Sequence, residues 1–157
     1  AQMARALEGF RKTAIEVEEY NLRELGEARI QLTNAIESIS EGFCLFDSDD
    51  RLVLQNNHYR ELFGLDDSHL GSSFESLLKR AMESRIESDA DHDDYFQKRL
   101  AHHQNPPGPY VQKLRDGTWL RITERKTDNL GTVAIDSDKA ARAGAGQGAG
   151  RPRQNAG

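Results

Sequence analysis

The sequence predicts an α+β fold in which one long helix precedes a domain of short helices and five strands. Three observations lead to this prediction. Apolar residues recur at helical spacing from Met3 to Ile39, the spacing changes to alternation from Gly42 onward, and three further strand-like runs follow Pro109. Within each group of strands, short turns rich in Asp, Gly and Asn join neighbouring runs, so we expect antiparallel pairing.

The composition excludes several classes of protein. Of the 157 residues 36% are hydrophobic and 30% charged, and no window approaches the roughly 18 uninterrupted apolar residues of a membrane helix. No secretion signal is visible, so we expect a cytoplasmic protein. Residues 1–138 hold 17 basic and 26 acidic side chains, a net charge of −9. Because an acidic body repels nucleic acid, we expect no nucleic-acid partner.

Residues 1–39 predict one long amphipathic helix. Its apolar stripe follows steps of four and three, as in a coiled-coil seam, with a second step of four after Asn21 that locally unwinds such a coil. Gly9 and Gly26 each weaken the helix by about 1 kcal/mol, so a partner has to cover the stripe. We expect a homodimer; the alternative is a helix that folds back on its own domain. The expected contact residues are Leu7, Phe10, Ala14, Val17, Leu25 and Leu32.

The stretch from Gly42 to Leu54 predicts a β-hairpin. Its two runs, Phe43–Phe46 and Leu52–Leu54, flank DSDD, a turn of residues whose side chains bond their own backbone. Because the first run is apolar throughout, we expect both of its faces to be covered. Cys44 is the single cysteine, so no intramolecular disulfide can form, and we expect it to pack as a small apolar side chain.

Three helices are predicted next. The first is capped by Asn56 or Asn57 and ends at Gly64. The second, in SSFESLLKRAMES, begins with a capping box of Ser72 and Glu75 and carries a stripe of five apolar residues. These two helices are expected to face the core. The third, in YFQKRLAHHQ, ends at a pair of prolines.

Three strand-like runs complete the domain, at Tyr110–Leu114, Thr118–Arg125 and Leu130–Ile135. The connections RDGT and TDNLG between them are good hairpin turns. The folded domain is therefore expected over residues 40–138. Residues 139–157 are rich in Gly, Ala and Arg without an apolar period, and we expect them to be disordered.

The side chains show no catalytic or metal-binding pattern. The five histidines include no pair spaced four apart and no nearby cysteines, and DADHDD lacks the glycine and the final glutamate of a calcium loop. Phosphate-binding glycine loops and G-x-S-x-G are absent. We therefore expect no metal site and no enzymatic activity. His103 shares a helical face with Phe96 and Leu100, which makes it the best candidate haem ligand; the alternative is an ordinary interface histidine.

The blocks AIESISEGFCLFDSDDRLVLQNNHYRELFG and HHQNPPGPYVQKLRDGTWLRITERKTDNLGTVAIDSD resemble a PAS domain. The resemblance covers about residues 33–138, and is greatest to the type found in bacterial sensor histidine kinases and adenylate or guanylate cyclases. It implies a five-stranded antiparallel sheet of order 2-1-5-4-3, with short helices over one face and an N-terminal helix capping the other.

The resemblance also implies a sensory and dimerisation module of a two-component or cyclic-nucleotide pathway, which passes a signal through flanking helices to a kinase or cyclase domain of a parent protein. Family members usually end in Asp-Ile-Thr before an output helix, whereas Lys139 and Ala140 follow Asp138 here. Our hypothesis is a truncated or frame-shifted product of a longer signalling gene. The alternatives are a regulatory fragment whose catalytic domain is missing and a purely structural interaction module.

Any ligand is expected between the inner face of the sheet and the helices. The expected lining or core residues are Tyr59, Phe63, Leu78, Phe96, His103, Trp119 and Arg121. Haem, held by His102 or His103, or another small ligand is one interpretation, and a filled core without a cofactor is the other. A covalent flavin is not expected, because flavin-binding members carry their cysteine in a helical Asn-Cys-Arg-Phe-Leu run and Cys44 lies in a predicted strand.

Overall fold

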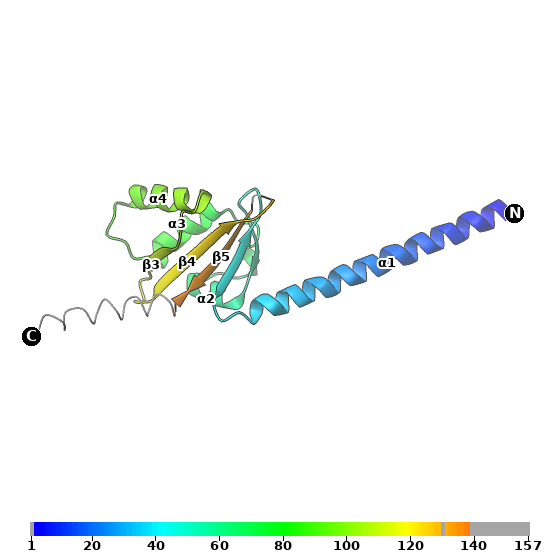
Figure 1. Ribbon diagram of the computed structural model, residues 1–157, viewed down its shortest axis with the longest axis horizontal. Coiled ribbons are helices and arrows are strands. Elements are labelled where there is room, and N and C mark those ends of the chain that lie inside the picture. The colour runs from blue at the N-terminus through cyan, green and yellow to red at the C-terminus, as the bar shows by residue number, and fades with distance from the viewer. Residues whose placement is uncertain (1, 130, 139–157) are drawn as a thin grey trace, which may run out of the picture. The chain divides into compact units, whose positions relative to one another are not determined.

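The computed structural model describes residues 2–129 and 131–138, and the chain divides into two units, residues 1–38 and 39–157. The first unit is helix α1, Gln2–Glu37, which runs without interruption for 36 residues (Figure 1). The prediction of one long N-terminal helix is confirmed, with an end two residues earlier than expected. The tail predicted to be disordered, residues 139–157, lies outside the described residues.

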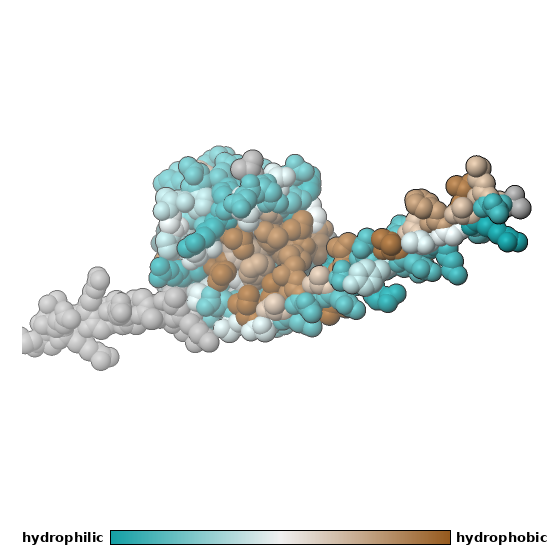
Figure 2. Space-filling model, turned by 45° about the vertical axis from the view of Figure 1, so that its right-hand side comes forward, coloured by the Kyte–Doolittle hydropathy of each residue, from teal (hydrophilic) through white to brown (hydrophobic). Residues whose placement is uncertain are grey.

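Apolar side chains of α1 are exposed along its length. The exposed fraction of the residue surface is 76% for Phe10 and 68% for Leu25. Among the described residues of the helix only Ile36 is buried. Figure 2 shows these apolar side chains recurring along the helix among hydrophilic ones. None of the helices in the described ranges combines the length and the apolarity that crossing a membrane requires.

The second unit is an antiparallel sheet with helices packed on one of its faces (Figure 1). The sheet has five strands in the order β2-β1-β5-β4-β3, which confirms the predicted order. The elements are β1 Gly42–Phe46, β2 Leu52–Gln55, α2 Asn57–Phe63, the 3₁₀ turn η1 Asp67–His69, α3 Phe74–Ser84, α4 His92–Gln104, β3 Tyr110–Lys113, β4 Trp119–Lys126 and β5 Thr132–Ser137.

Alternation along the strands separates an inner face, toward the helices, from an outer one. In β4 every second residue is buried, namely Leu120, Ile122 and Glu124. In β5 the buried positions include Ala134 and Asp136. Because β5 begins and ends two residues later than predicted, Asp136 lies inside the sheet rather than after it.

The turn between β1 and β2 is built by its own acidic residues. The Asp47 carboxylate accepts hydrogen bonds from the backbone N–H groups of Asp49 at 2.9 Å and Arg51 at 3.0 Å. Asp50 adopts a left-handed conformation with φ 59°, which Asp tolerates better than most residues. The predicted hairpin is therefore confirmed, and its turn directs the Asp50 side chain back over the domain.

The helix termini match the sequence prediction with one exception. Asn56 caps α2, and Gly64 ends it in a left-handed conformation with φ 66°. The predicted capping box of Ser72 and Glu75 is wrong by one residue, because Ser73 caps α3 and accepts from the Ser76 N–H. The Ser72 carbonyl instead accepts a hydrogen bond from the backbone N–H of Leu52 at 2.9 Å.

The core lies between the inner sheet face and helices α3 and α4. The predicted stripe of α3 is confirmed, because all five of its apolar residues are buried. The buried apolar residues of the core are Cys44, Phe46, Leu52, Phe74, Leu77, Leu78, Ala81, Met82, Ile86, Tyr95, Phe96, Leu114, Leu120, Ile122 and Ala134.

Candidate functional site

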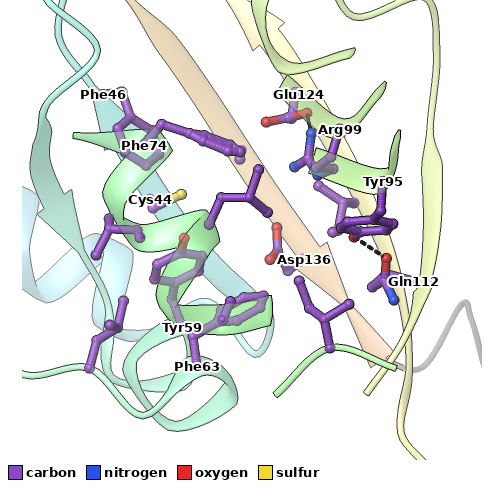
Figure 3. Close-up of a pocket in the computed structure, with 17 residues that line it drawn as sticks. Cys44, Phe46, Tyr59, Phe63, Phe74, Tyr95, Arg99, Gln112, Glu124 and Asp136 are labelled. Carbon is purple, nitrogen blue, oxygen red and sulfur yellow. Dashed lines mark hydrogen bonds and ion pairs between the residues drawn. The ribbon is translucent and has the colours of Figure 1, made fainter. Parts of the chain in front are cut away.

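A cavity of about 50 Å³ lies within this core (Figure 3). It is small beside the roughly 300–1,000 Å³ of pockets that hold drug-sized ligands. Strands β1, β3, β4 and β5 and helices α2, α3 and α4 all contribute to its wall. The lining residues are Cys44, Phe46, Tyr59, Phe63, Leu65, Phe74, Leu77, Leu78, Ala81, Ile86, Tyr95, Arg99, Gln112, Ile122, Glu124, Ala134 and Asp136.

Asp136 is the carboxylate on the floor of the cavity. It projects from β5 between Gly42 of β1 and Ile122 of β4, its partners in the strand register, and points into the cavity in Figure 3. Its residue surface is 2% exposed, and its Oδ1 has no hydrogen-bond partner among the described residues. Burial raises the pKa of Asp136 to about 7, a shift that Arg99 opposes and the charge of Glu124 increases.

Cys44 and Tyr59 are neutral polar residues beside Asp136. The thiol and the phenol both face the cavity, and burial raises the pKa of each well above its usual value. Since a thiolate is the nucleophilic form of cysteine, this thiol is unreactive at neutral pH. The expectation that Cys44 packs in the core is confirmed.

Arg99 and Glu124 form a buried ion pair at another side of the cavity. The Arg99 Nη1 lies 2.8 Å from Glu124 Oε1, and both side chains are less than a tenth exposed. The guanidinium also lies 5.1 Å from the ring centres of Phe74 and Tyr110, at cation–π distance from both. Burial alone would raise the pKa of Glu124, but hydrogen bonds and charge from His103 and Arg99 lower it to about 2.

His103 lies behind this pair, outside the cavity lining, and is fully buried. Its Nδ1 is 2.6 Å from Glu124 Oε2 and its Nε2 is 2.7 Å from Asp50 Oδ1. Both ring nitrogens of His103 are therefore engaged by carboxylates. A haem iron would need one of these nitrogens, so it could bind His103 only by displacing a carboxylate contact.

His102, the other histidine considered for haem, is also engaged through both nitrogens. Its Nδ1 lies 3.2 Å from Glu124 Oε1 and its Nε2 lies 2.9 Å from the Gly108 carbonyl oxygen. Within residues 2–129 and 131–138, no three His, Cys, Asp or Glu side chains are arranged to hold a metal ion.

The residues predicted from the sequence divide into three groups. Tyr59, Phe63 and Leu78 line the cavity, whereas Phe96 is buried in the core without lining it. Trp119 and Arg121, also expected at the pocket, are exposed at alternate positions of β4 and face away from this cavity.

Sequence reasoning missed the three charged residues of the wall. Glu124 and Asp136 occupy inner positions of their strands, and Arg99 lies on the buried side of α4. The alternation along the strands indicated the two acidic residues, because each lies two positions after an apolar residue of the inner face. Glu124 follows Ile122 in this way, and Asp136 follows Ala134. For Asp136 this indication was missed because the predicted strand ended at Ile135, which left Asp136 outside it.

The family model for the PAS fold matches residues 36–146. The chain belongs to the PAS family. The predicted resemblance is confirmed, and the domain is a signal-sensing module of the kind found in sensor proteins. PAS domains are regulatory rather than catalytic, which agrees with the absence of a catalytic pattern in the sequence.

Among curated proteins, this PAS chain is similar to the non-motile and phage-resistance protein of Caulobacter vibrioides, with 32% identity over 117 residues. The match covers 71% of this chain and 12% of that protein. The chain thus spans a small fraction of the length of its curated relative.

Two solved structures give the structural comparison. The DhaR(N)–DhaL complex of E. coli matches with a TM-score of 0.51 and 16% identity, over 76% of this chain and 38% of that one. The PAS domain of an HTR-like protein from Haloarcula marismortui matches with a TM-score of 0.48 and 17% identity, over 76% of this chain and 98% of that one. At such identities the likeness concerns the fold alone.

Proposed function

We propose that this chain is the sensory and dimerisation module of a bacterial signal-transduction protein in a two-component or cyclic-nucleotide pathway. A histidine kinase or cyclase domain of a parent protein is the proposed effector. The observation that carries the proposal is the pairing of a PAS domain, whose core holds a cavity with a polar floor, with a long helix whose apolar stripe is exposed. A change in the domain would be passed on through the paired helices.

Dimerisation through α1 follows from its surface. Leu7, Phe10 and Leu25 each leave more than half of their residue surface in contact with water. Each apolar side chain that a partner helix buries contributes about 1.5–3 kcal/mol at most, so several along one stripe favour pairing strongly. The steps of four and three keep those residues on one side of the helix, where a second copy can cover them.

Sedimentation velocity over a range of concentrations tests this proposal. The wild type is expected to sediment as a dimer, and the double variant Phe10→Glu, Val17→Glu as a monomer, because two glutamates in each helix would be buried against each other. The matched control is Arg5→Glu, Lys12→Glu, which introduces two glutamates with the same spacing of seven on the opposite side of the helix. It is expected to remain a dimer.

A wild type that is monomeric at every concentration would contradict dimerisation through α1. Equal loss of the dimer in both double variants would show that charge, rather than the apolar stripe, decides association. Circular dichroism checks that each variant keeps its helix content.

A further inference from the structure

We propose that the cavity binds a small uncharged molecule that donates a hydrogen bond from a hydroxyl or amide N–H group to Oδ1 of Asp136. The inference rests on the proposed sensory function, since it names the chemical class of ligand for that cavity. It starts from the only buried carboxylate oxygen among the described residues that has no hydrogen-bond partner.

Other polar groups of the wall already bond one another. Tyr95 donates its hydroxyl to Gln112, and Arg99 donates to Glu124. Gln112 in turn donates to the carbonyl of Glu87 at 2.9 Å. Buried polar groups in folded proteins nearly all have partners, so Asp136 is the place where the wall lacks a donor.

The charges around Asp136 select an uncharged ligand. Glu124 increases the pKa of Asp136 by its negative charge, which means that it is close enough to repel an anion as well. Arg99 acts on the same carboxylate in the opposite direction, so its positive charge offsets part of the attraction that the carboxylates exert on a cation. Because the remaining wall is mostly apolar, a charged ligand would also lose its hydration without replacement.

The size and lining of the cavity limit the rest of the ligand. One water molecule needs about 10–15 Å³ of such a volume, so the cavity of about 50 Å³ has room for about four, or for an organic molecule of about three to five non-hydrogen atoms. Phe46, Phe74 and Leu78 supply an apolar surface for its carbon atoms. The expected class is therefore a small alcohol or primary amide.

The test compares ethanol with acetonitrile, which have the same number of non-hydrogen atoms but differ in that only ethanol can donate a hydrogen bond. Each is titrated into the full chain, and binding is read from the amide signals of Cys44 and Ala134 in two-dimensional NMR spectra. At about pH 8, above the pKa of about 7 of Asp136, the carboxylate is mostly ionised, and ethanol is expected to bind with a Kd at least about tenfold lower, as for a hydrogen bond to a charged acceptor.

Two variants assign this preference to Asp136. Asp136→Asn keeps the size of the side chain but offers an N–H to the acetonitrile nitrogen and a weaker acceptor to ethanol, so the preference is expected to fall to about threefold or less. Asp128→Asn makes the same chemical change at an exposed residue of the β4–β5 turn and is expected to keep the preference of the wild type.

Equal binding of the two probes to the wild type, or no shift of the cavity signals with either, would overturn the inference. So would an unchanged preference in Asp136→Asn. None of these outcomes affects the dimerisation of α1, which sedimentation measures separately, so failure of the ligand assignment and failure of the proposed function are distinguishable.

Discussion

His103 and Asp50 are separated by 53 positions in the chain, yet their side chains meet at 2.7 Å. The contact joins helix α4 to the turn between β1 and β2. On its other side His103 meets Glu124, which also pairs with Arg99. Arg99, His103 and the two carboxylates thus form one largely buried network, in which removing one partner leaves another buried polar group without its contact.

Replacing Asp50 by Asn tests the contribution of this turn. The amide oxygen can still accept a hydrogen bond from His103 but carries no charge, and Asn tolerates the left-handed backbone. Since the Asp50 side chain is 36% exposed, we expect a loss of about 1 kcal/mol in the free energy of unfolding, measured by urea denaturation. Asp49→Asn, in the same turn, is expected to change it by less than about 0.5 kcal/mol. Equal effects of the two substitutions would contradict the charged contact.

The lowered pKa of Glu124 leads us to expect a loss of stability in acid. Its folded-state pKa of about 2 is below the ordinary 4.5, so its contribution is present above about pH 4.5 and is lost as the pH falls toward 2. The contribution is of the order of 3 kcal/mol. In Glu124→Gln the protein should be less stable at neutral pH, and its difference from the wild type should shrink as the pH falls. Urea denaturation across this range measures the difference, and Glu83→Gln, on the exposed side of α3, should show no such convergence.

The raised pKa of Asp136 leads us to expect the opposite pH dependence of stability. Its folded-state pKa of about 7 lies above the ordinary 3.8, so the folded state retains a proton that the unfolded chain releases. Stability should therefore decrease as the pH rises from about 4 to about 7, by up to about 4 kcal/mol, and change little from this residue above that range. Asp136→Asn removes this dependence and should be more stable than the wild type at about pH 8 but not at about pH 4. Denaturation curves that keep a constant separation between these pH values would exclude a protonated Asp136.

The arrangement of strands and helices could be predicted from local patterns. Asn56 and Gly64 mark the two ends of α2 by chemistry that depends only on neighbouring residues, and the structure confirms both. The boundary of α3 moved by one residue because Ser72 pairs with Leu52, a contact between distant parts of the chain. Local capping rules do not contain such contacts.

The polar part of the site was harder to predict for the same reason. In the sequence Asp50 belongs to a turn, and nothing nearby indicates a histidine more than fifty positions later. Trp119 was expected at the pocket from its place in the strand, but the register of β4 places it on the outer face. Which face a strand residue takes depends on the pairing of the whole sheet, and a shift of one residue reverses it.

Gly131 offers a test of the junction between β4 and β5. A Cβ atom at this residue would lie 2.5 Å from the carbonyl oxygen of Phe46, in the neighbouring strand β1, and 3.1 Å from Thr127 Oγ1. Because the nearer atom is backbone, Gly131→Ala should displace the strand ends and lower the free energy of unfolding by about 1–3 kcal/mol.

Gly108→Ala is the matched control for this substitution, since a Cβ at that glycine would meet no atom within 4 Å. Alanine restricts the unfolded chain more than glycine does, so this variant should equal or exceed the wild type in stability by up to about 1 kcal/mol. In thermal denaturation we therefore expect Gly131→Ala to lower the melting temperature and Gly108→Ala to leave it unchanged or raise it. If Gly131→Ala were as stable as Gly108→Ala, β1 could not approach the β4–β5 turn as closely as the structure shows, and the pairing of Phe46 with Thr132 would be in error.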